Sequence, residues 1–197
     1  MISILDYGTG NLRSLSNALK FLEIEHIVTK NHKKIINSKK LIIPGVGSFN
    51  TGMKNLKKFG LIKVLQNFGI VQKKPILGIC LGMQLMMSNG YENKKNKGLN
   101  FVKGNCVKIK GNVKLPHVGW KKVSFKKDYK SLKKTNLYFC HSYVCKIDDE
   151  KFITSKTQYK KNRFVSSFKK DNFFGFQFHP EKSKEDGLKI LNYFCNL

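Results

Sequence analysis

The chain has 197 residues, 41% of them hydrophobic, which is enough for one well-packed domain over residues 1–197 and short for two. Its formal net charge of +26 would suit a nucleic-acid partner, but the only arginines are Arg13 and Arg163. Because dedicated nucleic-acid surfaces use the planar arginine fork, the scattered lysines favour a solvated surface, and we expect no nucleic-acid partner.

The sequence shows neither a membrane-spanning nor a targeting segment. No apolar run approaches the ~20 residues that cross a bilayer, and the first residues lack a basic leader and a long apolar stretch. We therefore expect a cytoplasmic protein without membrane contact. Five cysteines without a CxxC pair predict free thiols, no structural metal and no cofactor. They are Cys80, Cys106, Cys140, Cys145 and Cys195.

The first part of the chain alternates between strand and helix patterns. Short apolar runs end in turns such as DYGTGN, and leucines then recur at steps of three and four, the spacing of an amphipathic helix. Strands are expected at residues 2–5, 25–30, 39–45 and 75–79, and helices at residues 12–22 and 48–68 and directly after residue 79.

From about Leu99 to Phe178 the pattern changes to short strands and turns, with a hairpin turn at Asp171-Asn172. A last helix is expected over residues 184–195. The strands of this part are expected within residues 101–111, 137–146, 152–159 and 163–178. The whole pattern predicts an α/β fold: a single domain with an open mixed, mainly parallel sheet and helices on both faces.

Ligands of such sheets bind at the carboxyl ends of the strands. One of those ends carries GICLG, in which Cys80 has a glycine two residues to either side. This is the form of a nucleophile elbow with sulfur in place of a hydroxyl group, and the tight turn requires flanking residues without side chains. The start of the following helix would favour a thiolate, and the Leu81 N–H would point at an oxyanion. A buried cysteine beside helix-packing glycines is the structural alternative.

A thiol nucleophile needs a base and a group that orients the base. His179 and Glu181 follow an alternating aromatic strand that Pro180 ends, so both side chains would project from the strand's carboxyl end. The sequence therefore predicts a Cys–His–Glu triad. His26 and His32 are interpreted as surface residues. A glycine-flanked turn after the third strand, Gly45-Val46-Gly47, is a candidate for the second oxyanion donor or a simple tight turn.

Together the motifs PGVG, GICLGMQ and FQFHPEKS, in this order and spacing, resemble the class I (triad) glutamine amidotransferases over nearly the whole chain. The resemblance implies that Cys80 attacks the glutamine carboxamide to form a glutamyl thioester. His179 would protonate the departing ammonia and then activate water, and Glu181 would orient His179. It further implies oxyanion donors at Val46 and Leu81, glutamine contacts at Gly47, Gln84, Ser142 and Tyr143, and a structural role for His141.

Two further segments, DYGTGNLRSL and LPHVGW, resemble the glutaminase subunits of histidine biosynthesis within that family. These form a heterodimer with a (β/α)8-barrel cyclase subunit, which receives the ammonia and makes imidazole glycerol phosphate and AICAR. The resemblance implies partner contacts at Asn11, Trp120, Tyr138 and Lys182 and weak activity until the cyclase is docked and occupied. A rotating peptide in the PGVG turn is a hypothesis for that control.

Two other functions stay open at this point. A paralogous amidotransferase could carry nearly identical motifs and supply ammonia to another acceptor. A basic nucleic-acid-associated module, or an inactive scaffold, would instead show strongly salt-dependent nucleic-acid binding that does not change in Cys80→Ala. Cys140 also departs from the apolar residue that the family often has at its position.

Overall fold

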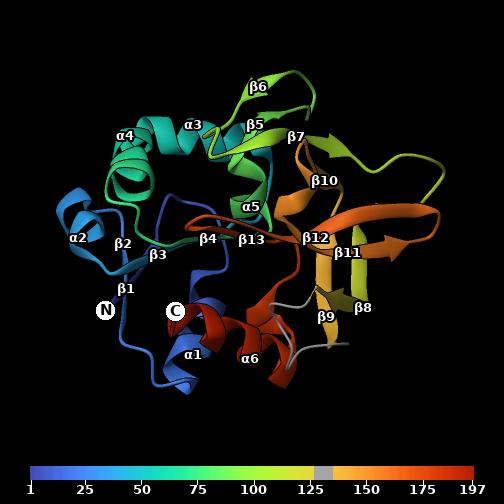
Figure 1. Ribbon diagram of the computed structural model, residues 1–197. Coiled ribbons are helices and arrows are strands. Elements are labelled where there is room, and N and C mark those ends of the chain that lie inside the picture. The colour runs from blue at the N-terminus through green and yellow to red at the C-terminus, as the bar shows by residue number, and fades with distance from the viewer. Residues whose placement is uncertain (127–134) are drawn as a thin grey trace.

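A computed structural model describes residues 1–126 and 135–197 of the chain (Figure 1). Five parallel strands form one half of the main sheet in these ranges, in the spatial order β2, β1, β3, β4, β13. Their bounds are β2 (His26–Thr29), β1 (Ile2–Leu5), β3 (Lys40–Ile43), β4 (Ile76–Ile79) and β13 (Phe173–Phe176).

Antiparallel strands continue the sheet beyond β13, so the expected mixed, mainly parallel sheet is confirmed. In spatial order they are β12 (Asn162–Lys170), β11 (Ile153–Tyr159), β8 (His117–Phe125) and β9 (Thr135–His141). A smaller sheet of the described residues lies beside it. Its strands, in spatial order, are β10 (Tyr143–Ile147), β7 (Val102–Lys108), β5 (Met87–Gly90) and β6 (Asn96–Lys97).

Helices cover both faces of the parallel half, as expected (Figure 1). The helices on one face are α1 (Leu12–Phe21) and α6 (Lys184–Cys195). Those on the other are α2 (His32–Asn37), α3 (Phe49–Lys58), α4 (Leu61–Gln66) and α5 (Leu81–Leu85). The remaining helical turns are η1 (Asn67–Val71), η3 (Glu150–Phe152) and η4 (Pro180–Lys182).

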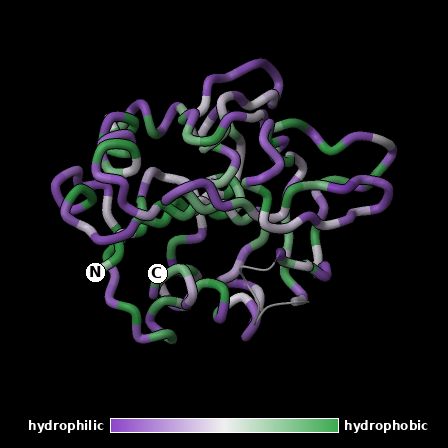
Figure 2. The backbone as a smooth tube through the Cα atoms, viewed as in Figure 1, coloured by the Kyte–Doolittle hydropathy of each residue, from purple (hydrophilic) through white to green (hydrophobic). Residues whose placement is uncertain are grey.

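The alternation of side chains along each strand divides the core between these two faces. Leu41 and Ile43 pack with the α2–α5 face, whereas Ile42 between them packs with α1 and α6. A central strand that is buried on both sides therefore reads as a continuous apolar run. Figure 2 shows hydrophobic residues along the central strands and hydrophilic residues along the outer loops. No helix in the described ranges is long and apolar enough to cross a membrane.

Some predicted elements differ in detail from the structure. The helix expected over residues 48–68 is broken into α3 and α4, because Gly60 adopts a left-handed φ of 65°. The segment 137–146 divides at Ser142 between the two sheets, and α2, β5, β6 and β8 were not predicted. The hairpin at Asp171-Asn172 is confirmed: it joins β12 to β13, with Asp171 at φ 52°.

Candidate active site

Cys80 stands at a sharp backbone corner between β4 and α5. Its φ of 52° and ψ of −106° are a strained conformation for a residue with a side chain. A Cβ on Gly78 would lie 2.6 Å from the Gly82 carbonyl carbon, and a Cβ on Gly82 would overlap the carbonyl oxygen of Ile43. Both neighbours must therefore be glycine, and the corner holds the thiol at the carboxyl end of β4.

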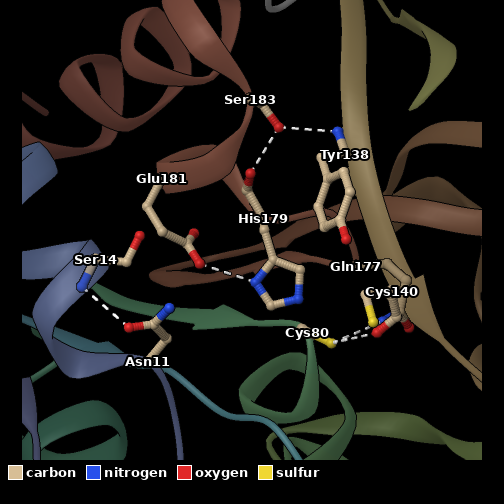
Figure 3. Close-up of polar contacts among 9 residues, drawn as sticks. All are labelled: Asn11, Ser14, Cys80, Tyr138, Cys140, Gln177, His179, Glu181 and Ser183. Atoms are coloured by element: carbon tan, nitrogen blue, oxygen red, sulfur yellow. Dashed lines mark hydrogen bonds and ion pairs between the residues drawn. The ribbon is translucent and has the colours of Figure 1, made fainter. Parts of the chain in front are cut away.

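The Cys80 sulfur has polar neighbours although the residue is only 6% exposed. The Sγ lies 3.7 Å from the Cys140 carbonyl oxygen and 3.6 Å from the Gln177 side-chain nitrogen (Figure 3). A cysteine that only fills a core would be surrounded by hydrocarbon. This thiol instead lies where a polar reaction centre can form.

His179 and Glu181 lie at the end of the neighbouring strand and face the same corner. The His179 Nδ1 is 2.9 Å from the Glu181 Oε1, and both side chains are buried. Figure 3 shows the other ring nitrogen on the side that faces Cys80. Burial alone lowers the pKa of His179, but the adjacent Cys80 sulfur and then Glu181 raise it, to about 10 overall. The imidazole is therefore held as imidazolium at neutral pH.

The Leu81 N–H forms a hydrogen bond with the turn Gly45-Val46-Gly47. It donates to the Gly45 carbonyl oxygen at 3.4 Å. This carbonyl and the Val46 N–H belong to one planar trans peptide and point in opposite directions, so the Val46 N–H faces away from the site. The Tyr7 hydroxyl packs against the turn and donates to the Pro44 carbonyl oxygen at 2.6 Å. Gly47 follows with a φ of 106° and open space around it.

Three of the four residues expected to contact glutamine lie where α5 meets the start of β10. The buried Gln84 side chain donates from its Nε2 to the Tyr143 carbonyl oxygen at 3.0 Å. Ser142 and Tyr143 are half-buried where β9 passes into β10. Gln84, Ser142 and Tyr143 thus lie together.

Two polar residues of this region were missed by the sequence reasoning. The Glu92 Oε2 accepts the Phe49 N–H at 2.7 Å, and its charge raises the pKa of Tyr143 after burial, the larger cause. Gln177 contacts the Cys80 sulfur directly. Glu92 lies in a polar loop with no local pattern to mark it. Gln177 could have been found from the sequence, because it is a lone amide between the two phenylalanines of FQF.

The residues expected to contact a partner form an aromatic and basic patch at this edge. The Trp120 and Tyr138 rings meet edge to face at 5.9 Å, and the Lys182 Nζ lies 5.8 Å from the Tyr138 ring centre. Trp120 is 38% exposed, and Val118 beside it is 56% exposed. Asn11 is exposed and caps α1 by accepting the Ser14 N–H at 3.1 Å (Figure 3).

His141 lies in a buried histidine pair behind the site. Its Nε2 is 3.2 Å from the His117 Nδ1, and its own Nδ1 is 3.0 Å from the Tyr143 carbonyl oxygen. Burial, and next His117, lower the pKa of His141 to about 3. Burial and then Lys121 lower the pKa of His117 to about 4. Both rings are therefore neutral, and they pack between the strands as uncharged groups.

The fold agrees with comparisons to known proteins. The family model "Glutamine amidotransferase class-I" matches residues 3–196. The chain belongs to the class-I glutamine amidotransferase family.

Its relatives in that family are similar over their whole length. Imidazole glycerol phosphate synthase subunit HisH 1 of Campylobacter jejuni subsp. jejuni (strain 81-176) is 45% identical, with 100% of both chains covered. The HisH subunit of Aquifex aeolicus (strain VF5) is 41% identical, covering 97% of this chain and 94% of the relative. A crystal structure of a glutamine amidotransferase, 16% identical, superposes with a TM-score of 0.79 over 100% of this chain and 99% of the other. At that identity it shows the shared fold alone.

Proposed function

We propose that this chain is the cytoplasmic glutaminase subunit of imidazole glycerol phosphate synthase, acting in histidine biosynthesis. The observation that carries the proposal is Cys80 on a strained corner beside the buried His179–Glu181 pair. The full-length similarity to HisH subunits supports the choice of this pathway over a paralogous one. The ammonia acceptor in the proposal is a (β/α)8-barrel cyclase subunit, which makes imidazole glycerol phosphate and AICAR.

The reaction begins when the Cys80 thiolate attacks the carboxamide carbon of glutamine. The carbon–nitrogen bond of the tetrahedral intermediate then breaks, and the His179 imidazolium gives its proton to the leaving nitrogen, which departs as ammonia. The neutral His179 next takes a proton from water, and the hydroxide attacks the glutamyl thioester. Glutamate leaves, and the thiolate and imidazolium are restored. Glu181 orients the ring throughout.

The pocket residues are assigned by the chemistry of free glutamine. Its carboxylate and amide suit the backbone of Gly47, Ser142 and Tyr143 and the amide of Gln84. Its α-ammonium group needs a carboxylate, and Glu92 supplies one beside Tyr143. We therefore add Glu92 to the glutamine-binding residues.

Control of the reaction rests in the Gly45–Val46 peptide. The Gly45 carbonyl that accepts the Leu81 N–H would repel the oxyanion of the intermediate. Rotating that one peptide would replace the carbonyl with the Val46 N–H and free the Leu81 N–H, giving two donors. We assign the described conformation to the inactive state, which the docked and occupied cyclase would convert to the active one.

The cyclase docks on the edge that carries the reaction centre. Ammonia released there would otherwise be protonated and lost in water, so a partner must cover the site. The exposed Trp120 and the half-buried Tyr138, with Lys182 above the tyrosine ring, form the anchor of this contact. Asn11 contributes from the start of α1.

The test is a glutaminase assay of the chain alone, with the cyclase, and with the cyclase and its nucleotide substrate. We expect little turnover alone, strong stimulation in the occupied complex, and none with Cys80→Ser. If a different acceptor enzyme stimulates turnover and the cyclase does not, the chain belongs to a paralogous pathway and not to histidine biosynthesis. Full turnover in Cys80→Ser would contradict the thioester mechanism.

A further inference from the structure

Gln177 is a buried polar side chain to which the reaction sequence above gives no role. Its side-chain nitrogen lies 3.6 Å from the Cys80 sulfur, and its Oε1 accepts from the Gln84 Nε2 at 3.1 Å. The same Gln84 nitrogen donates to the Tyr143 carbonyl oxygen at 3.0 Å. Two side-chain amides in series therefore connect the backbone at the glutamine pocket to the nucleophile.

The orientation of both amides follows from the end of this series. A backbone carbonyl can only accept, so Gln84 must turn its NH₂ group toward Tyr143. The second hydrogen of that NH₂ group then points at Gln177, which must present its oxygen in return. The Gln177 NH₂ group is left facing the Cys80 sulfur. The donor at the sulfur is thus fixed by the chemistry of the series.

A second contact makes this donor selective for the ionised sulfur. The Sγ also lies 3.7 Å from the Cys140 carbonyl oxygen, which can accept a hydrogen bond from a thiol S–H but repels a thiolate. When the proton leaves, the sulfur loses this partner and keeps the Gln177 N–H. A hydrogen bond to an ionised acceptor is about twice as strong as one between neutral groups. Figure 3 shows Gln177 and Cys140 together on this side of the sulfur, and His179 separately from them.

We propose that Gln177 is a positioning residue that stabilises the Cys80 thiolate and couples it to the glutamine pocket through Gln84. The proposal rests on the function proposed above. It assigns to one amide two effects, a larger thiolate fraction at neutral pH and a fixed direction of the sulfur. Because the series starts at the Tyr143 carbonyl, a substrate that shifts this backbone would also change the donor at the sulfur.

The test measures alkylation of Cys80 by iodoacetamide against pH, with the modified residue identified by mass spectrometry. Cys140 is exposed, so all proteins carry Cys140→Ser, which keeps its backbone carbonyl. In Gln177→Leu we expect the midpoint of the alkylation profile to rise by about one pH unit, the effect of one charge-assisted hydrogen bond. The rate at high pH, where every sulfur is ionised, should stay the same. Thr157→Val is the control, since Thr157 is also buried and its hydroxyl has no partner among the described residues.

An unshifted pH profile in Gln177→Leu would overturn the proposal. So would equal slowing at every pH, because a purely structural disturbance changes access rather than ionisation. If Gln177→Leu does not fold, Gln177→Glu has nearly the same shape and places a negative charge at the sulfur, which should raise the midpoint further. Glutamine turnover by the occupied complex is measured in parallel. A shifted profile without turnover in the parent protein would keep the positioning role and reject the proposed function.

Discussion

The α-carbon of Gly82 packs directly against the carbonyl oxygen of Ile43. No side chain fits between them, since a Cβ at position 82 would overlap that oxygen. This contact presses the first turn of α5 onto the end of β3, next to the turn that contains Gly45. The corner at Cys80 and the Gly45–Val46 turn are therefore in direct contact through backbone atoms.

Gly82→Ala should be among the most destabilising single substitutions of the chain. The clash is with rigid backbone rather than a flexible side chain, so we expect a loss of about 3 kcal/mol or more in the free energy of unfolding, measured by urea denaturation. Gly111→Ala is the matched control, with a positive φ of 87° and nothing within 4 Å. It should cost only the ~1–2 kcal/mol of left-handed backbone. Equal losses in both variants would contradict the close approach.

The imidazolium of His179 should persist far above neutral pH. Because its pKa is raised to about 10, hydrolysis by the occupied complex should not fall near pH 6.5 through this group and should decline as the pH approaches 10. Cys80→Ser removes the largest raising influence while burial still lowers the pKa, so the midpoint of the His179 titration should move down. NMR of labelled histidine measures it. An unchanged midpoint of the His179 titration in Cys80→Ser would show that the Cys80 sulfur does not interact with the His179 ring.

The buried His117–His141 pair should make the fold sensitive to mild acid. Unfolded histidines bind protons near pH 6.5. In the folded state the pKa of His117 is about 4 and that of His141 is about 3, so both rings stay neutral until the pH is much lower. The unfolded state therefore binds more protons between these values, and stability must fall as the pH falls from 6.5 toward 4. Each ring contributes up to about 1.4 kcal/mol per pH unit.

His141→Gln removes one titrating ring and keeps an acceptor for His117. Urea denaturation at several pH values should show a clearly shallower acid slope in this variant. Comparison of the two proteins at pH 8 gives the general cost of the substitution. A slope equal to that of the parent would show that the histidine pair does not carry the acid sensitivity.

Val46→Pro tests the oxyanion turn because proline has no N–H. If the Val46 N–H completes the oxyanion site, stimulated glutamine turnover should fall about 100-fold or more, the usual effect of losing one such donor. Val46→Ala keeps the N–H and should retain most turnover, since the side chain is largely exposed. Similar kcat values in the two variants would place the second donor elsewhere.

Trp120→Ala should weaken docking of the cyclase. A central aromatic anchor is worth about 2 kcal/mol or more, which is about 30-fold in Kd, measured by calorimetry. Val71→Ala is the control: Val71 is 71% exposed but lies in η1, which precedes the amino end of β4 at the opposite edge of the sheet. If both substitutions have the same small effect, the aromatic patch is not the docking surface.

The parts of the site that the sequence revealed are those fixed by local geometry. The corner at Cys80 is marked by glycines within two residues, and His179 is marked by the proline that ends its strand. These features depend on few neighbours, so a short window carries them.

Other features depend on contacts between distant segments and left no such mark. The orientation of the Gly45–Val46 peptide is set by the Leu81 N–H, which comes from a distant segment and donates to the Gly45 carbonyl oxygen. Glu92 accepts the Phe49 N–H from a loop whose own sequence is polar and carries no motif. The break between α3 and α4 at Gly60 was misread because the apolar spacing continues across it.

The pairing of β4 with β13 has a consequence for synthesis of the protein. These strands lie side by side in the sheet, with Ile79 opposite Phe176, although almost half of the chain separates them. During translation Cys80 emerges long before His179, so the two side chains meet only after the last strand has been inserted. Under the function proposed above, nascent or prematurely terminated copies would therefore not hydrolyse glutamine.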